Sequence, residues 1–133
     1  MTRTLAVGVS IGVSLALHQY LLVVCSSTAL VITLLDVAAL PLAFGLPFLG
    51  GLLASRGHEH AYTRHSAIVG VLAGIASLTA VAVRWATKPG IEFSAHQQMV
   101  QGFSYLVVFG HQVAFSIVGG YVATRMKRKP REL

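Results

Sequence analysis

The sequence of 133 residues contains little charge and few residues that could cross-link the chain. Charged residues make up 11% of it, whereas an average soluble domain has about 25%. This scarcity excludes an ordinary soluble globular domain, because most of its surface would not face water favourably, and it excludes a disordered chain. The single cysteine, Cys25, excludes an intrachain disulfide and a cysteine-based zinc site.

Catalytic patterns are also missing from the sequence. The four acidic residues are scattered, and there is no glycine-rich phosphate loop and no pair of carboxylates. No Ser-His-Asp combination has a defensible geometry. We therefore expect a protein that is not an enzyme and that carries no cofactor.

Long apolar runs dominate what the sequence does contain, since 55% of the residues are hydrophobic. A helix that crosses a bilayer needs about 20 mostly apolar residues. Four segments meet this requirement, at about residues 4–24, 29–54, 66–86 and 102–124. The sequence thus predicts an all-α integral membrane protein, an antiparallel four-helix transmembrane bundle with short loops. A single domain would cover residues 1–124, and a basic tail would follow at 125–133.

The basic residues predict the orientation of this bundle, because cytoplasmic segments are enriched in Lys and Arg. Arg84 and Lys88 lie on one side, and eight basic residues lie on the other, so both termini should be cytoplasmic (inner). The basic tail should contact anionic lipid headgroups, and nucleic acid is not an expected partner. The eight are Arg3, Arg56, Arg64 and, in the tail, Arg125, Lys127, Arg128, Lys129 and Arg131.

The second predicted span contains Pro41 and Pro47 on either side of Gly45. Each proline removes a backbone hydrogen bond, and in lipid the carbonyl that loses its donor needs a neighbouring helix or a water molecule. We predict a kink between residues 40 and 48. It is either a simple adjustment of shape or a hinge.

Ionisable residues inside the spans are the main candidates for a site, because lipid disfavours them. His18, Asp36, Arg84 and His111 come from four different spans, fall in the same outer half by residue count, and lie on the small or polar side of each helix. They predict one buried polar layer, with Ser14 and Gln112 as additional lining. The layer is either hydrogen-bonded glue between helices or a path for protons, ions or a polar solute.

Two further patterns concern packing and metal binding. Gly8 with Gly12, and Gly70 with Gly74, form small-residue ridges that allow close helix approach. The segment between the second and third spans offers three imidazoles, although it matches no zinc spacing, and we interpret it as a solvated loop. These weak metal candidates are His58, His60 and His65.

Three functions are compatible with these features. The first is a small, non-enzymatic structural or accessory component of a membrane assembly, including a minor membrane protein of an enveloped particle, with other membrane subunits or further copies as partners. The second is a small oligomeric transporter or channel that uses the layer of His18, Asp36 and His111. The third is a haem-binding membrane subunit with His18 and His111 as axial ligands.

Overall fold

The computed structural model describes residues 1–24, 29–86 and 95–128, and within these ranges it contains helices and no strand. Four α-helices follow one another along the chain. They are α1 (Thr2–Val24), α2 (Ala29–Ser55), α3 (Tyr62–Ala86) and α4 (Ala95–Arg128), with a short 3-10 helix, η1 (Glu59–Ala61), before α3. The all-α class predicted from the apolar runs agrees with this architecture.

Two helices extend beyond the predicted spans. α3 begins at Tyr62 rather than near Ser66, and α4 runs from Ala95 to Arg128 rather than from Gly102 to Thr124. Polar residues before and after an apolar run continue a helix when no proline interrupts it. The first part of the predicted tail, through Arg128, is therefore helical, whereas Lys129 and Arg131 lie outside the described residues.

Within the described ranges, three helical segments are long and apolar enough to cross a membrane: Thr2–Leu21, Tyr62–Val83 and Gln98–Met126. A fourth is broken, because Thr33–Ala39 and Pro41–Ser55 pass the same test only together and meet at 41°. The bend lies at Pro41, whose ring clashes with the preceding turn and lacks a donor. The predicted kink of the second span is thus present. Pro47 is buried in the second of these segments. A side chain added at Gly45 would meet open space.

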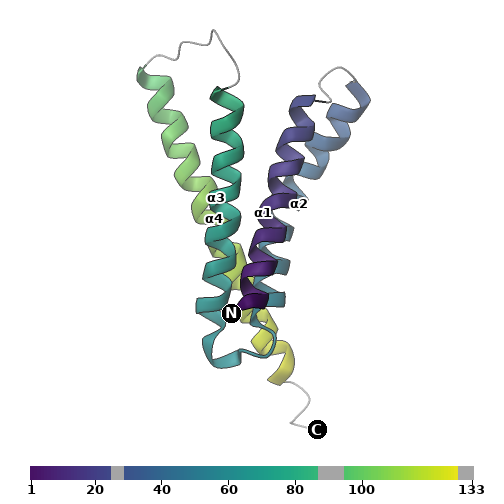
Figure 1. Ribbon diagram of the computed structural model, residues 1–133, viewed down its shortest axis with the longest axis vertical. Coiled ribbons are helices and arrows are strands. Elements are labelled where there is room, and N and C mark those ends of the chain that lie inside the picture. Colours follow the sequence, from purple (N-terminus) through teal and green to yellow (C-terminus); the bar gives the residue numbers. More distant parts are fainter. Residues whose placement is uncertain (25–28, 87–94, 129–133) are drawn as a thin grey trace.

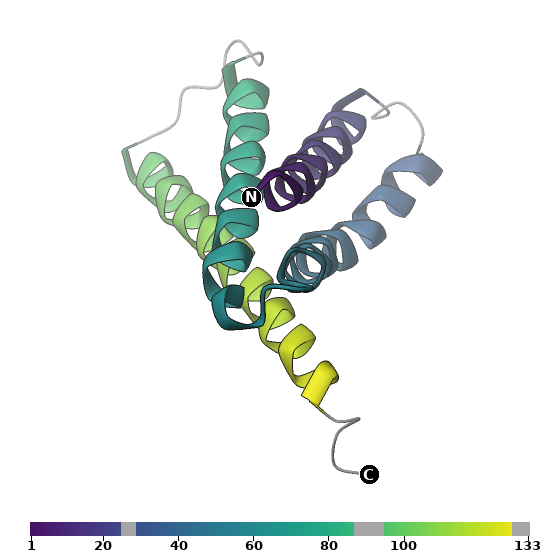
Figure 2. The same cartoon turned by 60° about the horizontal axis from the view of Figure 1, so that its bottom comes forward.

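Successive helices run in alternating directions and pack most closely at one end of the molecule (Figure 1). This end, called here the terminal end, carries the N-terminus, η1 and the last turns of α4. Toward the opposite end, called the open end, the helices diverge in both views (Figures 1 and 2). The most extensive contacts join α3 to α4, α2 to α4 and α1 to α3.

The apolar core is small and lies between α1, α2 and α3. Val69 and Ala73 of α3 are fully buried there, against Ile11 and Leu15 of α1 and Ala54 of α2. Only about a third of each of the three unbroken spans is buried inside the molecule. Most of the helix surface is therefore apolar and exposed, which suits lipid or a partner helix but not water.

Glycine allows α2 and α4 to cross with their backbones in contact. A methyl group added at Gly51 would overlap the carbonyl of Ser116, and one added at Gly119 would overlap the carbonyl of Phe48. The two predicted ridges also lie at crossings. Gly8 and Gly12 face α3, and Gly70 and Gly74 face α4.

Candidate functional site

His18 joins α1 to α2 near the open end. Its side chain is 7% exposed, and its Nε2 lies 3.0 Å from the backbone carbonyl oxygen of Leu35. A carbonyl oxygen can only accept a hydrogen bond, so the ring donates and Nε2 carries the hydrogen. The histidine thereby connects two helices through the backbone of one of them.

His111 of α4 makes an equivalent contact with the middle of α2. Its Nε2 lies 3.3 Å from the carbonyl oxygen of Ala43. In a regular helix this carbonyl would accept the N–H four residues later, but that residue is Pro47, which has none. With its hydrogen on Nε2, His111 supplies the donor that the proline removes, and a helix in lipid would need such a donor. The ring centroids of Phe44 and Phe115 lie 5.2 Å and 6.4 Å from that of the imidazole.

The two histidines serve different parts of α2. Leu35 and Ala43 are separated by about 12 Å along a helix and lie on opposite sides of the bend. The structure thus brings each histidine to α2 but does not bring the two to the same point on it. Asp36 and Arg84 lie within α2 and α3, and their side chains are outside the part of the structure that is described.

Gln112 has the least satisfied polar group near this site. Its side chain is 2% exposed, and its amide nitrogen lies 3.3 Å from Nε2 of His111. When Nε2 carries the ring hydrogen, it can donate to the carbonyl of Ala43. In the other tautomer Nε2 has a free lone pair and can accept from the amide N–H of Gln112. The ring therefore bonds to only one of these two groups at a time. The amide oxygen of Gln112 has no hydrogen-bond partner among the described residues. Ser14 is exposed and donates to Ser10 in its own helix.

A second set of buried polar contacts lies at the terminal end, and sequence reasoning missed it. The hydroxyls of Ser55 and Ser66 lie 2.8 Å apart, and Ser116 donates to the carbonyl of Ser66 at 2.7 Å. These contacts join α2, α3 and α4 through short side chains. The sequence does contain a signal for these contacts. Ser116 and Gly120 are four residues apart and so lie on the same face of a helix, where small residues allow close packing.

The three histidines predicted in the loop have different surroundings in the structure. His65 lies in the first turn of α3, is 8% exposed, and its Nδ1 lies 2.7 Å from the hydroxyl of Thr4. The ring centroids of His58 and His65 are 4.2 Å apart, whereas His60 is exposed. Interpreting this whole segment as a solvated loop was wrong for His65, because α1 covers it.

No metal centre emerges from these residues. Within the described ranges, no group of three or more His, Cys, Asp or Glu side chains could hold an ion. For haem, His18 and His111 would both have to release an Nε2 atom that now contacts a carbonyl of α2. What the arrangement does chemically is to satisfy backbone and side-chain groups between helices.

Comparison with other proteins adds no further identification. No known protein family, curated protein or solved structure matches this chain. Function must therefore be argued from the contacts themselves.

Proposed function

We propose that this chain is a polytopic integral membrane protein that acts as a non-enzymatic structural or accessory component of a membrane assembly. The observation that carries the proposal is the bonding of both intramembrane histidines. His18 and His111 each meet a backbone carbonyl of α2, so their imidazoles hold helices together. Intramembrane ionisable groups often serve transport, but these two have a structural use.

The exposed surface supports the same proposal. Val9, Val13 and Leu17 follow one another at helical spacing along α1, and each exposes more than half of its surface. Phe103 and Leu106 are similarly exposed on α4. Such apolar faces are compatible with lipid and with neighbouring membrane subunits or further copies of this chain. In this proposal the terminal end faces the cytoplasm, as the distribution of basic residues favours.

A second candidate function is a small oligomeric transporter. Gln112 favours it, because a buried amide oxygen without a partner could accept a hydrogen bond from a polar solute. The imidazole of His111 beside it can exchange its hydrogen between two positions, as a proton path requires. A transporter must move protons or a solute across the membrane, whereas a structural component need not.

Flux separates the two candidates. The purified protein would be placed in liposomes that contain a pH-sensitive dye, and proton entry would be measured after a pH step. We expect no entry above that of empty liposomes. We also expect Asp36→Asn to insert normally and only to unfold more easily. Thr33→Val, an exposed change on the same helix, should insert normally and keep the wild-type stability. Proton entry that Asp36→Asn abolishes would overturn the structural proposal.

The size of the native assembly is the second test. Solubilised gently from its own membrane, the protein should migrate with other membrane chains, or with its own copies, in a complex of fixed stoichiometry. A monodisperse monomer in mild detergent would count against the proposal.

A further inference from the structure

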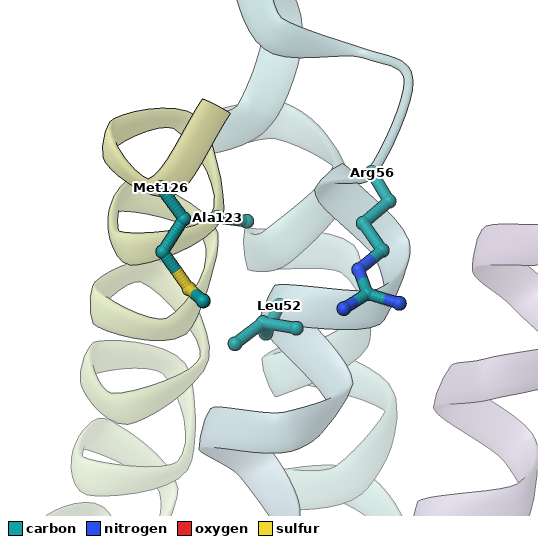
Figure 3. A pocket seen from close by; sticks show the side chains of 4 residues that line it. All are labelled: Leu52, Arg56, Ala123 and Met126. Atoms are coloured by element: carbon teal, nitrogen blue, oxygen red, sulfur yellow. The ribbon is translucent and has the colours of Figure 1, made fainter. Parts of the chain in front are cut away.

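A hollow of about 250 Å³ lies between α2 and α4 at the terminal end (Figure 3). Leu52 and Met126 point toward one another across it, from α2 and α4 respectively (Figure 3). Ala123 forms part of its wall, and Arg56 follows directly after the last residue of α2. An enclosed cavity of about 150 Å³ accepts benzene, so this hollow has room for a short stretch of hydrocarbon.

The lining combines an apolar wall with one cation. Three of the four side chains are hydrocarbon or thioether, and Met126 exposes 63% of its surface. The guanidinium of Arg56 turns back along α2 to the level of Leu52 (Figure 3). In the proposed orientation the cation therefore lies at headgroup depth, with apolar groups on the membrane side.

Arg56 is available for a ligand. No ion pair or hydrogen bond of its guanidinium is present among the side chains that the structure describes. Arg125, which directly precedes Met126, is instead bonded to its own helix, where its Nε donates to the hydroxyl of Tyr121 at 2.8 Å. Among the basic side chains that the structure describes, Arg56 is thus the one that lines this hollow.

We infer that this hollow binds an anionic phospholipid, with the phosphate on Arg56 and the upper part of an acyl chain against Leu52, Ala123 and Met126. Guanidinium groups bind phosphate through paired, charge-assisted hydrogen bonds. The apolar wall selects a ligand that carries hydrocarbon next to its phosphate, which a free phosphate ion lacks. The inference rests on the membrane location in the proposed function.

The test compares two lipids and two arginines. Purified protein in detergent would receive phosphatidylglycerol or phosphatidylcholine with the same acyl chains, and native mass spectrometry would count the lipids bound. We expect Arg56→Gln to weaken phosphatidylglycerol binding about tenfold, because it loses a charge-assisted hydrogen bond. The matched control is Arg64→Gln, which removes an exposed charge from the first turn of α3 and should change binding far less.

The wall requires its own variant. Ala123→Leu keeps every charge and fills the hollow, so it should also reduce lipid binding while leaving the helical circular dichroism unchanged. Inorganic phosphate at millimolar concentration should not displace the lipid. Displacement by phosphate alone would indicate a simple anion site and would overturn the inference.

Two other outcomes would also overturn it. Equal losses for Arg56→Gln and Arg64→Gln would show diffuse attraction to positive charge. A lower Tm with unchanged lipid binding for Arg56→Gln would show that Arg56 only satisfies the last carbonyls of α2. Flotation of the same protein with liposomes separates the two proposals. A protein that does not float contradicts the membrane location, whereas one that floats without lipid selectivity contradicts this site alone.

Discussion

The terminal end and the open end of the bundle are held together by different means. At the terminal end, α2, α3 and α4 touch backbone to backbone, and short hydroxyl side chains such as those of Ser55, Ser66 and Ser116 bridge them. Farther along the bundle, the contacts belong to longer side chains, because His18 and His111 reach carbonyls of α2.

This difference follows from the distance between backbones. In a bilayer the hydrophobic effect does not drive helices together, so association depends on close packing and interhelical hydrogen bonds. A serine hydroxyl reaches a neighbouring helix only where glycine removes the side chain between them. Once the helices diverge, only a side chain as long as histidine can connect them.

Apolar side chains remain exposed at both ends. Leu30 and Leu34 of α2, and Phe103 and Leu106 of α4, each expose more than 60% of their surface toward the open end. Met126 exposes 63% of its surface at the terminal end as well, so that end is distinguished by its backbone contacts and not by complete burial of apolar side chains. The open end is where lipid or a partner would contribute most.

The largest expected effect is at the backbone crossing of the terminal end. Gly119→Ala would place a methyl group on the carbonyl of Phe48. Relieving this overlap requires one of the two helix backbones to move. We expect a loss of about 3 kcal/mol in the free energy of unfolding, at the upper end for overpacking. Denaturant unfolding in micelles, followed by circular dichroism, measures it.

Gly110→Ala is the matched control, since it lies on the same helix with open space around it. It should be neutral or stabilising, because alanine favours a helix by up to about 1 kcal/mol over glycine. Equal losses at the two positions would show that the crossing does not depend on close approach.

The second effect concerns the donor that His111 supplies to the Ala43 carbonyl. His111→Ala should destabilise the protein. The same change should cost less in a protein that already carries Pro47→Ala, because the alanine N–H at position 47 can then donate to the carbonyl of Ala43. We expect a coupling of about 1 kcal/mol in this double-mutant cycle. Strict additivity of the two changes would mean that His111 does not replace the missing donor.

Part of this arrangement could be predicted from the sequence. The apolar runs predict helices long enough to span a membrane, and Pro41 predicts the bend. Pro47 predicts a carbonyl at Ala43 that needs a donor from outside its helix. Each of these inferences uses local rules within one helix, which a sequence displays directly.

The rest depends on which helices meet and at what height. Residue counts place His18 and His111 at similar depth. They cannot show that the two rings contact carbonyls at different levels of a bent α2. Serine gives a weaker signal still, because Ser66 resembles any small residue in a span until Ser55, Ser116 and Gly120 are known to surround it.

A smaller effect tests the attachment of α1 to the terminal end. Thr4 is 1% exposed and its hydroxyl lies 2.7 Å from Nδ1 of His65. Thr4→Val keeps the shape but removes the hydroxyl, so it should cost about 1 kcal/mol. Hydrogen exchange should accelerate in the first turns of α1. Thr79→Val is the control, because that exposed hydroxyl bonds only within its own helix, and comparable losses for both variants would contradict a role in joining α1 to α3.

The smallest effect is expected at an exposed contact of the same end. Arg125 donates to the hydroxyl of Tyr121 and lies 5.3 Å from its ring centroid, but both side chains are exposed. Tyr121→Phe keeps the ring and removes the hydrogen bond, so we expect a loss below about 0.5 kcal/mol. A loss as large as that of Thr4→Val would mean that polar bonds stabilise the terminal end regardless of burial. The contrast between the two ends would then reflect the number of such bonds and not the close approach of the backbones.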